Sequence, residues 1–340
     1  MAAVRRWLDG FGWNLFQARQ DLVTAVSRKA TILNQLTSIF PSTTVAALSS
    51  LWTGSAPAQH GLAGLRLFFP DFGVSAGMLD FSPLFFKAKD ALVAAGLDLN
   101  AFLQHPGVGE QLAAAGIPTF AFKGIEIVNS ALSQMHGRGV ADSFGVVTFA
   151  DMLVQMRELL EKRAGERLFI NAYWPSIDTL SDYHTWQGTA VSAELRALFT
   201  QLQLEFLDVL TDTARQDTVL LIAADHGQEL TPISQQIFLS DHPQLANMLF
   251  MRPTGEPRVL YLYSKHGCQQ PVIAYFQEQL SHAVTAVATE DALQAGLFGP
   301  PPFAENIADR LGDVVAIMRQ GYTLFSEAER ETAHKMIGRH

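Results

Sequence analysis

The chain is poor in cysteine and in charged residues, and it has no long apolar run. Its one cysteine, Cys268, excludes an internal disulfide and is typical of a reducing compartment. No segment approaches the roughly 18 consecutive apolar residues that a membrane-spanning helix needs. The first nine residues also lack the apolar core of a signal peptide. These absences predict a soluble, cytoplasmic protein with no membrane partner.

Basic residues are scarce as well. The chain has 24 Lys and Arg and 33 Asp and Glu, which gives a net charge of −9. Nucleic acid is held by clustered Lys and Arg, so this balance excludes it as an obligate partner. What the chain has in quantity is apolar residues, at 48% of its 340 positions. That content is enough to bury a large core.

Strand-like and helix-like segments alternate along the chain, which predicts an α/β fold. Apolar runs typical of buried strands lie at residues 119–122, 168–173, 218–223, 259–263 and 314–318, and helical periodicity covers residues 151–163 and 192–215. We expect a three-layer α/β/α sandwich with a mostly parallel central sheet, built as one domain over residues 1–340. Residues 65–116 are rich in Phe, Gly and Pro and break the alternation, so they predict a small inserted lobe or cap.

One strand-like run ends directly at Ala224-Asp225-His226-Gly227. Ligands in open α/β sheets bind at the carboxyl ends of the strands. A carboxylate oxygen and an imidazole nitrogen at such an end can both bind one divalent metal ion. An isolated Asp-His pair is more often a solvated turn, so the metal hypothesis depends on matching motifs elsewhere.

Two matching motifs lie near the beginning of the chain. Leu8-Asp9-Gly10-Phe11-Gly12 places an acid before two glycines that permit a sharp exit from a strand. Phe40-Pro41-Ser42-Thr43-Thr44 has the residues of a helix start, and Gly54 those of its end. A hydroxyl at a helix start lies beside unpaired N–H groups and the positive end of the helix dipole. Such a helix start can bind phosphate.

Two further groups of polar residues complete the set. Asp178, Asp182 and His184 follow the strand-like run at residues 168–173 and offer oxygen and nitrogen ligands near the same edge of the sheet. A polar loop explains them equally well in the absence of a metal. His340 follows Gly338 and Arg339 at the end of the sequence.

Together these motifs resemble the alkaline phosphatase superfamily, and within it the type I phosphodiesterase/nucleotide pyrophosphatase family. The resemblance runs through nearly the whole chain and rests on Leu8-Asp9-Gly10-Phe11-Gly12, Phe40-Pro41-Ser42-Thr43-Thr44, Thr53-Gly54 with Pro57 and His60-Gly61, residues 173–178, Ala224-Asp225-His226-Gly227 and Gly338-Arg339-His340. It implies a hydrolase with two divalent metal ions, usually zinc, with manganese as the alternative. One ion would be held by Asp9, Asp225, His226 and Thr44, and the other by Asp178, a histidine a few residues later and His340.

The resemblance also implies that Thr44 is the nucleophile, activated by the metal, and that a phospho-threonine intermediate forms. The family places its nucleophile four residues after the Phe of Phe-Pro-Ser, which favours Thr44 over Thr43. The second-site pattern Asp-x-x-x-His is broken here, because position 182 is Asp. We therefore expect His184 to be the ligand, with Asp182 as the alternative. Expected ligands also lie close to both ends of the sequence.

The implied substrates are small phosphoric esters, namely phosphodiesters or nucleotide pyrophosphates. A phosphomonoesterase or phosphonate hydrolase of the same superfamily stays open, as does a non-catalytic remnant that binds phosphorylated ligands, which Asp182 favours. The resemblance argues against a sulfatase, because the sulfatase branch has Cys or Ser-x-Pro-x-Arg and residues 55–59, Ser-Ala-Pro-Ala-Gln, lack the Arg. The oligomeric state is open.

Overall fold

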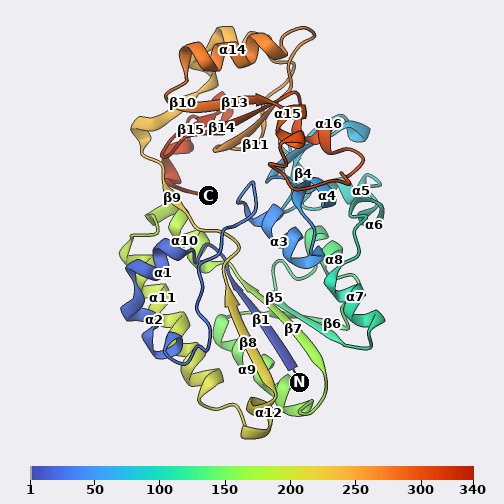
Figure 1. The fold of residues 1–340 in the computed structure, drawn as a ribbon, viewed down its shortest axis with the longest axis vertical. Helices are drawn as coiled ribbons and strands as arrows, with labels where there is room; N and C mark the ends of the chain where they lie inside the picture. The colour runs from blue at the N-terminus through green and yellow to red at the C-terminus, as the bar shows by residue number, and fades with distance from the viewer. Residues whose placement is uncertain (1) are drawn as a thin grey trace. The chain divides into compact units, whose positions relative to one another are not determined.

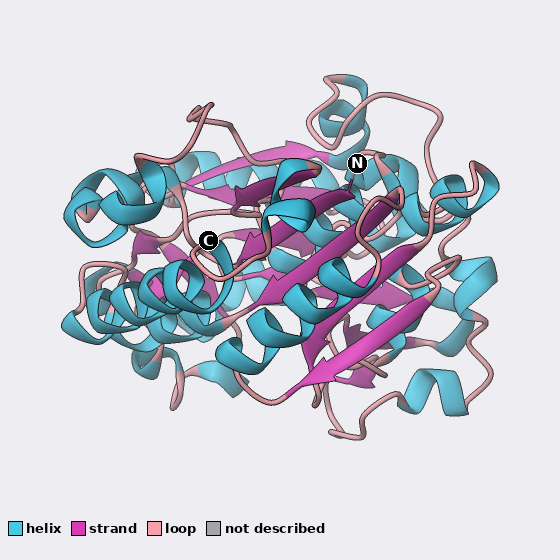
Figure 2. Ribbon diagram, turned by 90° about the horizontal axis from the view of Figure 1, so that it is seen from below, coloured by secondary structure: helices cyan, strands magenta, loops and turns pink. Residues whose placement is uncertain are grey.

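A computed structural model of the protein describes residues 2–340, and the chain divides into two compact units. The first comprises the segments up to Ser38, Trp52–Gly54 and Pro106–Gln228, and the second comprises Ile39–Leu51, Ser55–His105 and Glu229–His340. The lobe expected at residues 65–116 falls mostly within the second unit, in the segment Ser55–His105. Figure 1 follows the chain through its elements, and Figure 2 distinguishes the strands from the helices that flank them.

The first unit is built on a five-stranded sheet in the order β6-β5-β7-β1-β8. The strands are β1 (Ala2–Leu8), β5 (Thr119–Gly124), β6 (Asp142–Val146), β7 (Leu168–Trp174) and β8 (Thr218–Ala223), and every neighbouring pair runs parallel. β5 and β7 read as almost continuous apolar runs because inner strands of a parallel sheet are buried on both faces. The predicted α/β fold with a mostly parallel central sheet is confirmed.

The helices of the first unit are α1 (Trp13–Ala18), α2 (Gln20–Ser27), α7 (Val108–Ala114), α8 (Ala131–His136), α9 (Phe149–Lys162), α10 (Ser176–His184), α11 (Thr189–Leu202) and α12 (Asp212–Gln216). Side chains of α2, α9 and α11 share one apolar core with β1, β5 and β7. In Figure 1, α1, α2 and α11 lie together beside the sheet, and α11 contacts both α2 and α9.

The single helix predicted over residues 192–215 is interrupted. It ends at Leu202 and continues as a wider turn, Gln203–Leu207, in which the Asp208 N–H donates to the Gln203 carbonyl at 2.9 Å. Leu202, Phe206 and Leu210 recur every four residues, slightly more than one α-helical turn. The wider turn keeps Phe206 and Leu210 buried, and α12 then begins at Asp212.

The second unit has a four-stranded antiparallel sheet in the order β11-β12-β14-β13. Its strands are β11 (Thr254–Glu256), β12 (Val259–Leu262), β13 (Val284–Ala288) and β14 (Val314–Met318). The runs at residues 259–263 and 314–318 are strands as expected, but they pair antiparallel in this second sheet and not in the parallel one. A helix between two strands covers a sheet whether the strands run parallel or antiparallel, so alternation does not fix their direction.

Shorter elements complete the second unit. Its small sheets pair β2 (Arg66–Phe69), β3 (Val74–Gly77) and β4 (Ser82–Pro83), β9 (Glu229–Leu230) with β16 (Gly338–Arg339), and β10 (Gln236–Phe238) with β15 (Thr323–Phe325). Its helices are α4 (Pro57–His60), α5 (Ala91–Ala94), α6 (Leu99–Phe102), α13 (Pro243–Met248), α14 (Gln269–Gln279), α15 (Thr289–Gln294) and α16 (Ile307–Leu311). Helix α3 (Thr44–Thr53) begins in this unit, and 3-10 turns lie at Pro70–Phe72, Ile233–Gln235, Leu239–Asp241, Glu327–Glu329 and Ala333–Lys335.

Among residues 2–340, no helix combines the length and apolar character needed to cross a bilayer.

Lys123 is a cationic residue on β5 that is buried in the first unit. Its Nζ donates to Ser133 Oγ at 3.0 Å and lies 5.5 Å from the centre of the Trp52 ring. Burial lowers the pKa of Lys123 from its usual 10.5 to about 8. The charged form of Lys123 therefore lowers the stability of the folded protein.

We expect Lys123→Met to raise the free energy of unfolding at pH 7 by about 1–2 kcal/mol, because a buried charge is removed. Between pH 8 and 10.5 the unfolded wild-type chain binds more protons at this lysine than the folded chain does. Wild-type stability at this residue therefore rises with pH over that window. Urea unfolding of both proteins at pH 7 and pH 10 should show the gap between them shrinking. A gap of constant size would contradict the assignment of the buried charge.

Candidate active site

Three adjacent strands of the first unit are followed, within four residues of their ends, by acidic residues at the same edge of the sheet. β1 pairs with both β7 and β8, and Leu8 is in register with Trp174 at the ends of their strands. Asp9 follows β1 directly, Asp178 lies in the first turn of α10 after β7, and Asp225 lies two residues beyond β8. Parallel pairing therefore brings together carboxylates that are far apart in the sequence.

The two glycines of the Asp9 motif allow close approach of the backbone. Gly10 has a φ of +71°, and a Cβ there would lie 2.8 Å from the Cα of Asp178. A Cβ on Gly12 would lie 2.5 Å from the Cα of Gly227. Both positions exclude a side chain, because real Cβ atoms do not approach other atoms so closely. The sequence Asp-Gly-Phe-Gly thus holds Asp9 against the first turn of α10, which carries Asp178, and against the loop that carries His226.

Asp9, Asp225 and His226 form a compact buried group. The His226 Nε2 lies 3.3 Å from Asp9 Oδ1 and 3.6 Å from Asp225 Oδ2. One ligand atom from each of the three residues lies within 4.8 Å of the other two. All three side chains are almost completely shielded from solvent.

The hydrogen bonds around this group leave its acceptor atoms facing one another. The Nδ1 of His226 is 3.0 Å from the Gly227 carbonyl, so it carries the proton and Nε2 presents a lone pair in the neutral ring. Asp225 Oδ1 accepts from the Gly10 and His226 amides, and Tyr173 OH donates to Asp9 Oδ2. Asp9 Oδ1 and Asp225 Oδ2 accept no hydrogen bond from any residue that the structure describes. Two carboxylate oxygens and an imidazole nitrogen therefore converge on one point.

Electrostatics also favour a positive charge at that point. Burial, followed by the charges of Asp225 and Asp178, raises the pKa of Asp9 well above its usual value. Burial and the Asp9 charge likewise raise the pKa of the Tyr173 hydroxyl, which keeps it a hydrogen-bond donor to Asp9. A divalent cation would offset the repulsion among the carboxylates. An oxygen-oxygen-nitrogen donor set with a hydrogen-bonded supporting shell fits a metal such as zinc.

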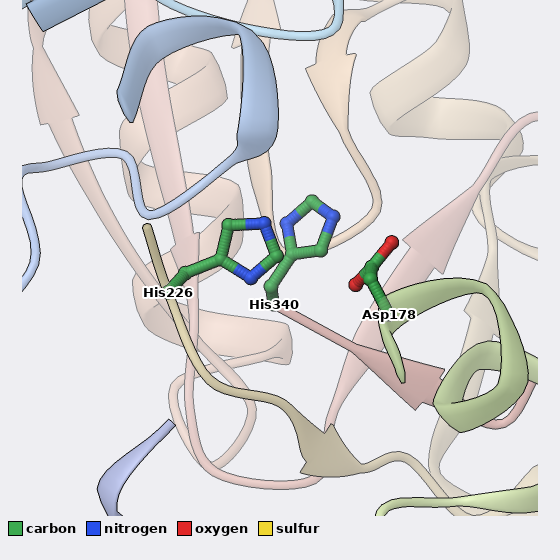
Figure 3. Close-up of side chains that lie close together, drawn as sticks. All are labelled: Asp178, His226 and His340. Atoms are coloured by element: carbon green, nitrogen blue, oxygen red, sulfur yellow. The ribbon is translucent and has the colours of Figure 1, made fainter. Parts of the chain in front are cut away.

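Asp178 belongs to a second polar group in the same unit. Gln228 Nε2 donates to Asp178 Oδ1 at 2.5 Å and to Asp182 Oδ1 at 3.2 Å. His184 is exposed at the last residue of α10. Figure 3 shows Asp178 on α10, His226 on the loop after β8, and His340 beyond β16.

The second unit carries the threonines of the Phe-Pro-Ser-Thr-Thr motif. Thr44 is the first residue of α3, and Thr43 precedes it as the N-cap residue. The Thr43 carbonyl accepts the Ala47 N–H at 2.9 Å, which is the first hydrogen bond of the helix. Both are buried. Thr44 therefore stands where the first N–H groups of a helix lack partners within the helix.

The two histidines of the second unit that belong to the motifs have different surroundings. His60 is buried, accepts the Leu62 N–H on Nδ1 and contacts Ser50 Oγ through Nε2 at 3.0 Å, and burial lowers its pKa to about 3. It is a neutral structural residue. His340 lies with its Nδ1 3.3 Å from the buried Glu256 Oε2.

Sequence reasoning missed three residues that support the expected ligands, namely Tyr173 beside Asp9, Gln228 beside Asp178 and Glu256 beside His340. Tyr173 is the first residue of the motif at residues 173–178, and Gln228 directly follows the motif that ends at Gly227, and these positions are the only signal the sequence carries for them. Glu256 lies on β11, far from any motif, and only the folded chain places it beside His340.

The second unit also holds a cavity of about 400 Å³. Phe69, Phe72, Phe102 and Arg310 are among the residues that line it. The Arg310 Nη1 donates to the Gly61 carbonyl at 2.8 Å. The Arg310 guanidinium carbon lies 4.2 Å from the centre of the Phe102 ring. The aromatic rings of this region therefore form its walls and its packing.

The model of the type I phosphodiesterase/nucleotide pyrophosphatase family matches residues 7–340. The chain belongs to this family of hydrolases, and the resemblance inferred from its motifs is confirmed. No curated protein matches the chain in sequence.

Solved structures show the same fold at low sequence identity. Human ectonucleotide pyrophosphatase/phosphodiesterase 5 superposes with a TM-score of 0.75 at 15% identity, covering 100% of this chain and 83% of that one. An inactive form of the murine protein in complex with AMP gives 0.71 at 15%, covering 99% and 83%. Phosphonoacetate hydrolase from Sinorhizobium meliloti 1021 in complex with phosphonoformate gives 0.71 at 18%, covering 97% and 83%. These likenesses establish an alkaline-phosphatase-like fold.

Metal addition should stabilise the protein, because a ligand that binds only the folded state adds to its stability. We expect zinc at about 100 times its dissociation constant to raise the free energy of unfolding by about 3 kcal/mol. Thermal unfolding after treatment with a chelator, followed by stepwise addition of zinc, measures this gain. An unchanged melting temperature at every zinc concentration would contradict a metal centre at Asp9, Asp225 and His226.

Proposed function

We propose that the protein is a metal-dependent hydrolase of small phosphoric esters, namely phosphodiesters or nucleotide pyrophosphates. The observation that carries the proposal is the convergence of Asp9 Oδ1, Asp225 Oδ2 and His226 Nε2, which are buried acceptor atoms arranged around one point. Family membership supports the reaction class. The AMP bound to the murine relative supports a nucleotide-like substrate.

In this proposal Asp9, Asp225, His226 and Thr44 hold one cation, and Asp178 and His340 hold a second. The third ligand of the second cation is His184 in the family pattern, with Asp182 as its alternative. When bound, the cations supply Lewis-acid stabilisation of the attacking and leaving oxygens. Tyr173 orients Asp9 by donating to its Oδ2, and the Gly227 carbonyl orients His226 by accepting from its Nδ1.

The nucleophile in the proposal is the Thr44 hydroxyl at the start of α3. Its oxygen bonds to phosphorus and its proton passes to water, while the bond from phosphorus to the leaving-group oxygen breaks and that oxygen takes up a proton, which yields a phospho-threonine. The N–H groups at the helix start donate to the phosphoryl oxygens. A water molecule then displaces Thr44 from phosphorus, so that phosphate ester is released and the hydroxyl is restored.

Two alternatives have support of their own. The fold shared with phosphonoacetate hydrolase supports phosphonate substrates, for which the same residues would act on a carbon–phosphorus bond. The replacement of the expected histidine by Asp182 supports a protein that binds phosphorylated ligands without turnover. A cytoplasmic location stays a prediction.

The deciding experiment measures metal content and hydrolysis by the same purified protein. Bis(p-nitrophenyl) phosphate, p-nitrophenyl phosphate and phosphonoacetate are offered as substrates at equal concentration, before and after removal of metal. We expect metal-dependent hydrolysis with preference for the diester. Preference for the monoester or for phosphonoacetate would assign the alternative reactions. A protein that binds metal and AMP yet hydrolyses none of the three would contradict the enzymatic proposal.

A further inference from the structure

Three consecutive apolar residues are exposed in the lobe of the second unit. Leu84, Phe85 and Phe86 directly follow β4, and they are 46%, 79% and 63% exposed. Single exposed apolar residues are normal on a protein surface, whereas a run of three is rare unless it has a function. The same lobe buries other phenylalanines, with Phe69 at 5% and Phe81 at 0%. The exposure of Phe85 and Phe86 therefore needs an explanation in the backbone of this loop.

Hydrogen bonds hold the loop in one conformation. The Phe86 N–H donates to the Pro83 carbonyl at 3.2 Å, which closes a turn. The buried Ser82 hydroxyl donates to the Phe86 carbonyl at 3.0 Å and accepts the Ala88 N–H at 2.8 Å. An ordered turn thus directs the apolar side chains to solvent, and they form a surface whose backbone is fixed.

Two lysines lie directly beyond the apolar residues. Lys87 and Lys89 are exposed, whereas the nearest acids in the sequence, Asp80 and Asp90, are half-buried. Segments that enter the interface of a bilayer combine aromatic and aliphatic side chains with lysine, because the apolar groups reach the acyl chains while the ammonium groups contact anionic headgroups. The chain has a net charge of −9, but charges more than about 10 Å from the bilayer are screened by salt. The local charge of the loop therefore decides the electrostatic contribution.

The size of the surface favours a lipid partner over a protein. A specific protein interface buries about 800 Å² on each partner. An aromatic side chain buries only about 150–250 Å² in full, and Leu84, Phe85 and Phe86 are each partly covered already. A bilayer adapts its shape to whatever enters it, so a small apolar surface can bind there reversibly. The sequence predicted no membrane partner because no run can span a bilayer, but insertion of a surface loop needs no such run.

We propose that Leu84, Phe85 and Phe86, together with Lys87 and Lys89, form a docking surface for a lipid bilayer that carries anionic headgroups. The apolar side chains enter the boundary between headgroups and acyl chains, and the two ammonium groups contact lipid phosphates. Binding is reversible, because the apolar area that enters the bilayer is small. The surface contains none of the proposed metal ligands, so the inference goes beyond the proposed function.

The test is flotation of the protein with vesicles of phosphatidylcholine, with and without phosphatidylglycerol. We expect the wild type to bind vesicles that contain phosphatidylglycerol, and to bind phosphatidylcholine alone more weakly. High salt should remove this difference, because it screens the lysines. The double variant Phe85→Ser/Phe86→Ser should bind both kinds of vesicle at least about tenfold more weakly. Lys87→Gln should weaken binding about fivefold, and only where phosphatidylglycerol is present.

Phe250→Ser is the matched control. Phe250 lies in the same unit and is 76% exposed, but its chain neighbours Leu249 and Met251 are buried and half-buried. This variant should bind vesicles as the wild type does. All of the variants should keep the wild-type melting temperature, because the replaced side chains are exposed. A loss of binding in the double variant then comes from the loop and not from unfolding.

Insertion is measured separately with a fluorescent residue in the loop. The emission of the Phe85→Trp variant, taken as a difference from wild type, should shift to shorter wavelength when vesicles are added. Lipids brominated in the acyl chain should quench it, because the indole ring lies at their depth. The Phe250→Trp variant should show neither effect.

Three results would overturn the inference. The first is no vesicle binding by the wild type, and the second is equal binding by the wild type and the double variant. The third is self-association in sedimentation velocity without lipid that the double variant abolishes while vesicle binding is absent, which would make this surface an interface between two copies. None of these results depends on metal content or hydrolysis, so the proposed function is tested separately.

Discussion

Thr44→Ala is expected to reduce turnover of a phosphodiester by at least about 1,000-fold, because the attacking oxygen is lost while the rest of the site remains. Thr44 is buried at the start of α3, and alanine is tolerated at the first position of a helix. The fold should therefore survive the change. Steady-state kinetics with bis(p-nitrophenyl) phosphate, together with a thermal unfolding curve, measures both effects.

Thr43→Ala is the matched control for this prediction. Thr43 is adjacent, of the same residue type and equally buried, and the family pattern makes it the competing nucleophile. We expect it to keep turnover within about tenfold of wild type, since only packing and a cap residue change. If Thr43→Ala abolished turnover and Thr44→Ala did not, the nucleophile would have to be reassigned to Thr43.

Asp225→Asn should have the second large effect, with turnover reduced at least about 100-fold and one equivalent of metal lost. The amide oxygen can still accept from the Gly10 and His226 N–H groups, so the loop is expected to keep its shape. Removal of the charge also relieves the repulsion that raises the pKa of Asp9. We therefore expect the metal-free variant to be more stable than the metal-free wild type, by the order of 1 kcal/mol.

Asp208→Asn provides the control for charge removal. Asp208 is an exposed acid paired with Lys29 at 2.7 Å, away from the proposed ligands. The Asp208→Asn variant should keep the metal content and turnover of the wild type, because a surface ion pair contributes little to stability. Metal analysis and thermal unfolding of the wild type, Asp225→Asn and Asp208→Asn, with and without chelator, test whether Asp225 is a metal ligand. Full metal content in Asp225→Asn would remove Asp225 from the ligand set.

Most of the parallel sheet could be predicted because its strands are apolar runs, with β5 and β7 buried on both faces as inner strands and β8 at an edge. The runs at residues 119–122, 168–173 and 218–223 became β5, β7 and β8 with boundaries shifted by at most two residues. The antiparallel direction of β12 and β14 could not be predicted, since an apolar run contains no information about its neighbours. The break in the helix after Leu202 was missed because a spacing of four fits both a helix and a wider turn.

The candidate site was predictable to the extent that its residues follow strand ends. Asp9 and Asp225 stand beside His226 as the motifs indicated. The choice between Asp182 and His184 depended on which face of α10 each occupies, and the sequence left α10 itself undetermined. Tyr173, Gln228 and Glu256 contact expected ligands through hydrogen bonds or ion pairs whose partners are distant in the chain.

The order of residues along the chain was sufficient to establish the family, the parallel sheet and the strand ends that bear acids, because apolar periodicity and strand-end motifs are local properties. Only the folded structure determined that Asp9 Oδ1, Asp225 Oδ2 and His226 Nε2 face one another, and that Gln228 joins Asp178 to Asp182. These contacts arise where β1, β7 and β8 align side by side, and lateral strand pairing is a non-local choice made by the whole fold.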